Sequence, residues 1–266
     1  MIVRNRKRNH ESLYSNLELS YSANFSHVTD EPYGLKELLK VFLQEKIGFL
    51  IIHNCNKWLG LKRTRIHLIE VIRIFLRQAI LKRAKGLIFV SPCTKDYFEQ
   101  NSKNNYSCYY VPFGQVGKYP VENMRYESIV FPGSMNSTKN YNEIYCWLQV
   151  HRGNKIKVEF LGVPTDKFGE FWQSKFRDLS NPDVEVQTYS EYIDISLFNA
   201  ILTECDVLYV DFPEELETEE GYIEVYGESK ETGAPWLAYK FSKPIIVPSY
   251  YKLAYPKFEI TKDQIF

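Results

Sequence analysis

Residues that suit phosphate binding follow a short apolar run near the middle of the chain. Gly133 and Ser134 come directly after the run at 128–131, and Lys139 precedes a segment with helical spacing. A small residue after a strand lets the backbone approach a phosphate, and N–H groups at a helix N-terminus can bind the anion. A charge-assisted bond from a lysine to phosphate contributes about 1.5–3 kcal/mol. Lys139 therefore suits anion binding, although a lysine at a helix start can equally be a solvated charge.

A histidine suited to acid–base chemistry closes another apolar run. His53 ends the run at 48–53 and is followed by Asn54. An imidazole group is suited to proton transfer, but a lone histidine at a strand end can also be structural.

An acid-rich stretch precedes a second pair of small residues. Residues 214–231 hold eight Glu, and Thr232 and Gly233 follow them directly. Carboxylates such as Glu228 and Glu231 can accept hydrogen bonds from hydroxyl groups. In so acidic a stretch, either one can equally be a surface charge.

The elements that must position these residues form an alternating pattern. Short apolar, β-rich runs alternate with segments of helical spacing, which is typical of a parallel sheet covered by helices. The interval 115–125, with Gly117, Pro120 and mixed charge, indicates a boundary between two domains. We predict strands at 48–53, 86–91, 107–111, 128–131, 157–162, 183–186, 206–210 and 243–248, and helices at 35–44, 94–100, 140–150 and 197–205.

Several local patterns occur in the order expected of one family. In this combination the chain resembles the GT-B glycosyltransferases of the group 1, family 4-like type that build bacterial surface polysaccharides, over about residues 45–250. The patterns are AKGLIFVS (84–91), TKDYF (94–98), YYVPFG (109–114), IVFPGS (129–134) with Lys139-Asn140, GESKETG (227–233) and FSKPII (241–246).

The resemblance implies an α/β fold of two Rossmann-like domains. Residues 1–118 would form the acceptor-side domain and residues 119–266 the domain that binds the donor nucleotide. Relatives usually have more residues before the strand of His53, so the N-terminal domain is expected to be incomplete, as a fragment or a compact member.

The resemblance also implies roles for individual residues. His53 and Glu231 are the expected catalytic residues, and the remaining candidates would contact a nucleotide-sugar donor. That donor is a substrate, and neither a cofactor nor a metal is expected, because no DxD-type motif stands in a convincing turn. The expected donor-binding residues are Gly133, Ser134, Lys139, Glu228, Thr232 and Gly233.

One departure from the family leaves alternatives open. Retaining members usually carry a spaced pair of Glu before the Lys-Pro strand, where this chain has Leu237. The anomeric outcome is therefore open, and a catalytically silent GT-B-like subunit that binds another glycosyltransferase is the alternative to an active enzyme. An epimerase that shares the GT-B shape is a third interpretation.

Composition and charge bear on partners and location. The 33 basic and 33 acidic residues cancel, which gives no reason to expect a nucleic acid, and 44% hydrophobic with 25% charged residues is ordinary for a globular protein. Five scattered Cys suggest reduced thiols, and no apolar stretch approaches the roughly 20 residues that span a bilayer. We expect a cytoplasmic protein.

The interval 57–85 stands out from this neutral background. It holds nine basic residues and one acid, Glu70, with apolar residues at close to helical spacing. We expect its apolar side to pack in the core and its basic side to contact an anionic membrane surface, on the inner face of the plasma membrane. A lipid-linked acceptor would make that contact useful, but a solvated helix face accounts for the charges equally well.

Overall fold

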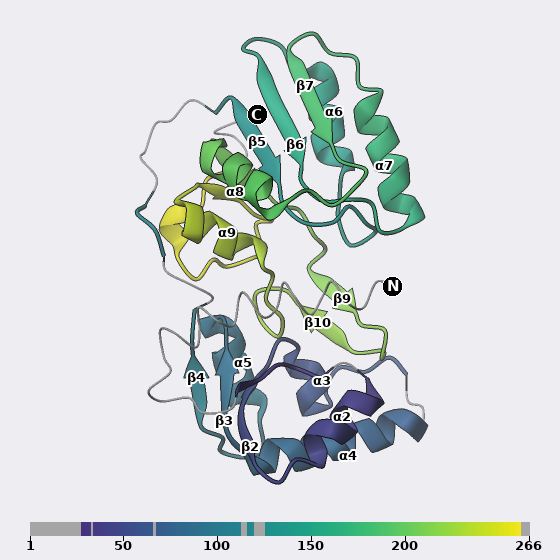
Figure 1. The fold of residues 1–266 in the computed structure, drawn as a ribbon, viewed down its shortest axis with the longest axis vertical. Helices are drawn as coiled ribbons and strands as arrows, with labels where there is room; N and C mark the ends of the chain where they lie inside the picture. Colours follow the sequence, from purple (N-terminus) through teal and green to yellow (C-terminus); the bar gives the residue numbers. More distant parts are fainter. Residues whose placement is uncertain (1–27, 33, 66–67, 113–115, 120–125, 262–266) are drawn as a thin grey trace. The chain divides into compact units, whose positions relative to one another are not determined.

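The computed structural model describes residues 28–32, 34–65, 68–112, 116–119 and 126–261 (Figure 1). The chain divides into two compact units. The first unit comprises Met1–Gly114 and Glu215–Thr232, and the second unit comprises Gln115–Glu214 and Gly233–Phe266. The expected division at residues 118/119 differs from these units, because it assigns Glu215–Thr232 to the C-terminal domain. Much of the expected boundary segment at 115–125 lies outside the described residues.

A four-stranded parallel sheet forms the centre of the first unit. Its strands occur in the order β1-β2-β3-β4. The two middle strands are almost continuous apolar runs, as is typical of parallel strands buried on both faces. The strands are β1 (Val28–Thr29), β2 (Ile47–Ile51), β3 (Ala84–Phe89) and β4 (Cys108–Tyr110).

Among the residues of this unit that the structure describes, four helices accompany the sheet. Their apolar side chains pack on it, with Leu38, Trp58, Ile80 and Phe98 all fully buried. The last helix begins where Ser91 caps its N-terminus and Pro92 occupies the first helical position, a common way to start a helix. The helices are α2 (Leu35–Phe42), α3 (Cys55–Leu59), α4 (Leu68–Arg83) and α5 (Pro92–Asn101).

Over the first turns of α4, the side of the helix that faces the core is the opposite of the one expected from the sequence. Arg77 has no exposed surface, and its guanidinium contacts Glu70 at 2.6 Å and Glu220 at 2.7 Å. Arg73 bonds the same Glu70 at 3.1 Å, and Lys57 is buried between Glu31 and Glu220. The apolar residues expected in the core are split: those near the end of the helix are buried, whereas those near its start are exposed. The exposed ones are Leu68, Ile69, Val71, Ile72 and Phe75.

The acid-rich stretch accounts for this orientation. It forms an antiparallel hairpin of β9 (Glu215–Glu217) and β10 (Ile223–Val225), which clusters with the first unit. Glu220 lies between Lys57, Arg73 and Arg77 at 3.3, 3.7 and 2.7 Å. The acidic hairpin therefore neutralises buried basic residues, and Lys57, Arg73 and Arg77 do not form the membrane-facing side that the sequence suggested.

A five-stranded parallel sheet forms the centre of the second unit, in the order β11-β8-β5-β6-β7. Helices α6 and α7 cover one face of it and α8 and α9 the other (Figure 1). Stacked aromatic rings fill the core, with the Phe131 and Phe160 ring centroids 4.5 Å apart and those of Phe160 and Phe176 4.2 Å apart. The elements are β5 (Ser128–Phe131), α6 (Asn142–Val150), β6 (Ile156–Phe160), α7 (Lys167–Arg177), β7 (Val184–Thr188), α8 (Ile195–Glu204), β8 (Val207–Tyr209), α9 (Ala234–Phe241), β11 (Ile245–Ile246) and the 3₁₀ turn η1 (Pro256–Phe258).

Two expectations about the whole chain can be compared with the structure. None of the five cysteines forms a disulfide bond. Within the residues that the structure describes, no helix has both the length and the apolar character needed to cross a bilayer.

Candidate functional site

The strand order of the second unit creates a place where ligands commonly bind. From β5 the chain builds the sheet outwards through β6 and β7, and then returns to add β8 on the other side of β5. The order therefore reverses between β5 and β8. In open parallel sheets, ligands bind outside the carboxyl ends of the strands at such a point.

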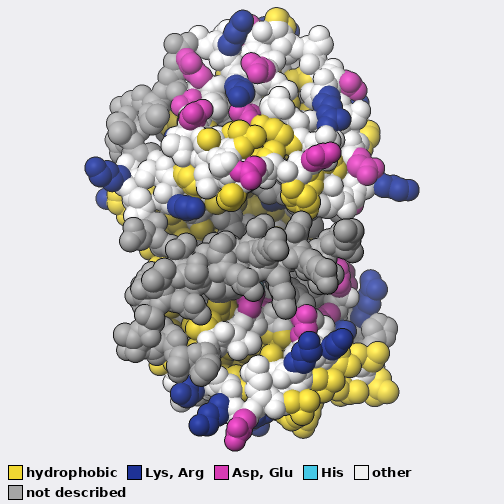
Figure 2. Space-filling view, in the orientation of Figure 1, with side chains coloured by type: hydrophobic (Ala, Val, Ile, Leu, Met, Phe, Trp, Pro, Cys, Tyr) yellow, Lys and Arg dark blue, Asp and Glu magenta, His cyan; other side chains and the backbone are white. Residues whose placement is uncertain are grey.

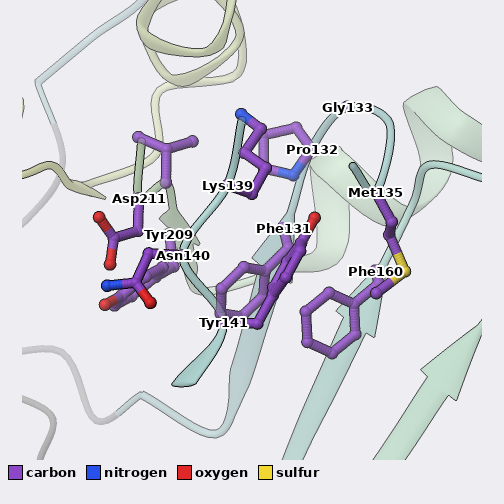
Figure 3. A pocket seen from close by; sticks show the side chains of 11 residues that line it. Phe131, Pro132, Gly133, Met135, Lys139, Asn140, Tyr141, Phe160, Tyr209 and Asp211 are labelled. Atoms are coloured by element: carbon purple, nitrogen blue, oxygen red, sulfur yellow. The ribbon is translucent and has the colours of Figure 1, made fainter. Parts of the chain in front are cut away.

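A small pocket lies at this edge of the sheet. Its residues come from the ends of β5, β6 and β8 and from the segment that leads into α6. Figure 3 shows Lys139 beside Pro132, with aromatic rings forming the wall of the pocket. The lining residues are Phe131, Pro132, Gly133, Met135, Lys139, Asn140, Tyr141, Phe160, Tyr209, Val210 and Asp211.

Close backbone packing holds the loop after β5. Gly133 has a φ of +90°, which favours glycine, and the space where a Cβ would stand is open. Its carbonyl oxygen would lie only 2.0 Å from a Cβ on Gly162, so the loop needs glycine at position 162 as well. Hydrogen bonds from Met135 to the backbone of Val163 (3.1 Å) and from Ser137 to Asp166 (2.9 Å) fix the rest. The loop backbone is thus preorganised next to the pocket.

Lys139 is the basic side chain of this pocket. Burial lowers the pKa of Lys139, and the nearby carboxylate of Asp211 opposes that change. Its Nζ lies 5.9 Å from the centroid of the Phe212 ring. A phosphate bound here would add the negative charge that favours the ammonium form.

A second group of polar side chains lies at the carboxyl edge of the sheet in the first unit. Since its strands are parallel, the residues after β1, β2 and β3 share that edge. The Nε2 atom of His53 lies 3.1 Å from Oδ1 of Asp30, and both side chains remain partly exposed. Glu31 accepts hydrogen bonds from the backbone N–H groups of His53 (2.7 Å) and Asn54 (3.1 Å). Asp30 and Glu31 thus fix both the ring and the backbone of His53.

The hairpin contributes further charges to this edge. Lys230 Nζ donates to Oδ1 of Asn54 at 2.6 Å, and burial lowers the pKa of Lys230. The fully buried Glu224 accepts hydrogen bonds from the N–H groups of Asn56 and Lys57 at 3.2 and 2.9 Å. Burial raises its pKa to about 7, although these bonds oppose the rise.

Glu231 lies at the same edge, beside the end of β3. Its carboxylate accepts a hydrogen bond from the backbone N–H of Thr232 at 3.0 Å and interacts with the side chain of Ser91. Burial raises the pKa of Glu231 to about 7, against the effect of these bonds. A carboxyl group that titrates near neutral pH is suited to proton transfer.

The predicted donor-binding residues fall into two groups. Gly133 and Lys139 line one pocket, and Ser134 follows in the same loop without lining it. Gly233 is the N-cap of α9, the helix that precedes β11. Because β11 runs parallel to β8, the chain must return from the carboxyl end of β8 to the start of β11, and α9 therefore begins at the carboxyl edge of the same sheet. The other two, Glu228 and Thr232, belong to the first unit with the hairpin.

The two predicted catalytic residues, His53 and Glu231, lie at one edge of the first unit. Sequence reasoning missed Asp30 and Glu31, because β1 has only two residues and gives no periodic signal. It also missed Asp211, which directly follows the predicted strand at 206–210. The signal that could have identified Asp211 was its position after a predicted strand, the same signal that identified Gly133.

Metal binding has no obvious place among the described residues. No cluster of three or more His, Cys, Asp and Glu side chains there is arranged to hold a metal ion.

Comparison with known proteins supports the fold. No protein-family model and no curated protein matches the chain. Among solved structures, sucrose-phosphate synthase from Thermosynechococcus elongatus is similar over 90% of this chain and 59% of its own, with 14% identity and a TM-score of 0.52. The structure of TarM is similar over 84% of this chain and 41% of its own, with 12% identity and a TM-score of 0.47, too low to carry weight.

The chain therefore spans 59% and 41% of the lengths of these two proteins. With the two parallel sheets and the observed strand order, the likeness to the synthase confirms the expected α/β fold of two Rossmann-like units, the GT-B-like fold. The expectation of an incomplete N-terminal domain stays a prediction.

Proposed function

We propose that the chain is a glycosyltransferase that transfers a sugar from a nucleotide-sugar donor to a saccharide or lipid-linked acceptor during surface polysaccharide synthesis. The observation that carries this proposal is the pocket at the strand-order reversal of the second unit. It combines an open Gly133 backbone with the basic side chain of Lys139, in a fold of the GT-B type.

The second unit would bind the donor diphosphate. The loop after β5 is held in place before any ligand arrives, so its N–H groups need little reorganisation to bind phosphate oxygens. When the bond to the sugar breaks, negative charge develops on the departing diphosphate. A lysine positioned at that charge stabilises the transition state more than the ground state, which accelerates the reaction. This proposal requires no metal.

The first unit would supply acid–base chemistry and contacts to sugar hydroxyls. A carboxylate next to Nε2 of His53 favours the tautomer that carries the proton on this nitrogen. Nδ1 is then the basic nitrogen, able to accept a proton from an acceptor hydroxyl or a hydrogen bond from a sugar. Glu231 and Glu228 would accept hydrogen bonds from donor hydroxyls.

The proposed location is the cytoplasm, at the inner face of the plasma membrane. Five cysteines without a disulfide bond suit a reducing compartment. A lipid-linked acceptor requires access to the membrane surface.

Nucleotide binding and turnover together test this function. We would measure binding of UDP, GDP and CMP by calorimetry, and release of free nucleotide from the matching sugar donors with and without a mixture of lipid-linked saccharides. Acceptor-dependent release that is unchanged by EDTA is the expected result.

Two other outcomes would point elsewhere. Failure of every nucleotide to bind would favour the catalytically silent subunit. Leu237 on α9 is a second argument for that alternative, because the enzymes that the chain resembles usually carry a carboxylate there. Conversion of the donor sugar without any acceptor would favour an epimerase.

A further inference from the structure

An apolar stripe lies on the outer face of helix α4. Leu68, Val71, Ile72 and Phe75 are spaced at i, i+3, i+4 and i+7, so they share one side of the helix. Leu68 is 80% and Phe75 is 67% exposed. Large apolar side chains in such a row usually face a core, and here the core-facing side carries Glu70 and Arg77 instead.

The neighbouring helix α2 extends this apolar surface. Helices α2 and α4 pack against each other, and Leu43 at the end of α2 is 76% exposed. Figure 2 shows hydrophobic side chains gathered where these two helices lie, with basic side chains beside them. We call the exposed residues Leu39, Leu43, Leu68, Val71, Ile72 and Phe75 the α2–α4 patch.

The exposed charges beside the α2–α4 patch are mainly positive. Lys36 and Lys40 are exposed on α2, with Glu37 as the exposed acid of that helix. On α4, Lys82 is exposed two turns beyond Phe75 on the same side, and Arg83 follows it. The acidic side chain of α4, Glu70, is buried and paired with arginines.

We infer that the α2–α4 patch inserts into the surface of an anionic lipid bilayer, with Phe75 and its neighbours among the acyl chains and the lysines at the headgroups. A helix with an apolar stripe bordered by Lys and Arg is suited to lie in this interface. The long lysine side chains can reach the headgroups while their methylene groups cover apolar surface. The inference goes beyond the proposed function and does not depend on it.

Charge argues against a second copy of the chain as the occupant. A symmetric dimer through this surface would bring Lys36, Lys40 and Lys82 of one copy close to those of the other. Like charges in an interface oppose association, whereas anionic lipids neutralise them.

Co-sedimentation with vesicles tests the inference. The full chain is mixed with vesicles of phosphatidylcholine and phosphatidylglycerol in equal parts, or of phosphatidylcholine alone. We expect binding to the anionic vesicles and a loss of about tenfold or more in partitioning for the double variant Val71→Ser/Phe75→Ser. The matched control is Val150→Ser/Phe171→Ser, which removes a Val and a Phe that are also exposed, from α6 and α7, and should bind like wild type.

A depth measurement separates insertion from adsorption. In Phe75→Trp, the added indole should be quenched by lipids brominated on the acyl chains, whereas in the control Phe171→Trp it should not. Binding that depends on salt but is equal in wild type and Val71→Ser/Phe75→Ser would overturn the inference, as it would show charge adsorption alone. So would lipid-independent self-association, seen by sedimentation velocity, that Val71→Ser/Phe75→Ser abolishes.

Discussion

The imidazole of His53 is held by the carboxylate of Asp30, with 3.1 Å between Nε2 and Oδ1. The two residues come from the ends of neighbouring parallel strands, β1 and β2. In the proposed mechanism, pairing with a carboxylate orients the imidazole as an acid–base group. Asp30 is therefore a positioning residue for His53.

We expect His53→Ala to lower kcat by roughly 10²–10⁴-fold, the usual contribution of a general acid–base group. The KM for the donor should change little, because we propose that the other unit binds the donor nucleotide. Asp30→Asn should lower kcat less, since the ring keeps a hydrogen-bond acceptor at that position. A large rise in donor KM with unchanged kcat in His53→Ala would contradict the assignment.

Lys139→Ala should weaken nucleotide diphosphate binding by about tenfold or more, which corresponds to about 1.4 kcal/mol per factor of ten. The reason is that Lys139 is the basic side chain of the pocket that also contains Gly133. Calorimetric titration measures the change, and the exposed Lys252→Ala in the same unit is the control. Unchanged affinity in a folded Lys139→Ala variant would exclude a role for this residue in donor binding.

The pKa of Glu231, which burial raises to about 7, predicts a pH dependence. Hydrogen bonds from sugar hydroxyls are stronger to the carboxylate form, which becomes populated as the pH rises through that value. We therefore expect kcat/KM to increase as the pH rises through about 7. This rise of kcat/KM with pH should disappear in Glu231→Gln and persist in Glu228→Gln, because Glu228 is exposed. Equal profiles in wild type and Glu231→Gln would contradict the proposed role.

The strands of the second unit could be predicted because each is a short β-rich run with its own boundaries. The runs are largely apolar in β5 and β8 and alternate with polar residues in β6 and β7. The run at 128–131 coincides with β5, and the run at 206–210 contains β8. Helix α7 was missed, although Phe168, Trp172 and Phe176 at i, i+4 and i+8 gave a usable signal. The pocket residues Gly133 and Lys139 were found because a small residue and a lysine that closely follow a strand suit anion binding.

The placement of the charged segments could not be predicted from one sequence. The interval 57–85 and the acid-rich stretch each resemble a solvated surface when considered separately. Their pairing through Glu220 and Arg77 joins residues more than a hundred positions apart, and spacing along the chain carries no information about it. Periodicity shows that α4 has two faces, but only the position of Glu220 decides which face is inside.

The buried guanidinium of Arg77 gives the last prediction. It bonds Glu70 at 2.6 Å and Glu220 at 2.7 Å and has no exposed surface. Removing one partner of such a buried network leaves uncompensated charge, which typically costs about 3–5 kcal/mol. Arg77→Met should therefore lower the free energy of unfolding by about that amount, measured by urea denaturation. Lys82→Met, exposed on the same helix, should change it by less than about 0.5 kcal/mol.

The pH dependence of stability distinguishes lost charge pairing from lost packing. Burial alone would raise the pKa of Glu70, but the hydrogen bond from Tyr222 and the charge and bonds of Arg77 hold the pKa below its ordinary 4.5. A carboxyl group with a lowered folded pKa stabilises the fold above its unfolded pKa, and this stabilisation is lost as the pH falls through the folded value. Wild type should thus lose stability on acidification below about 4.5, and Arg77→Met should lose less. If Arg77→Met is destabilised equally at neutral and acidic pH, the loss reflects packing and not the ion pairs.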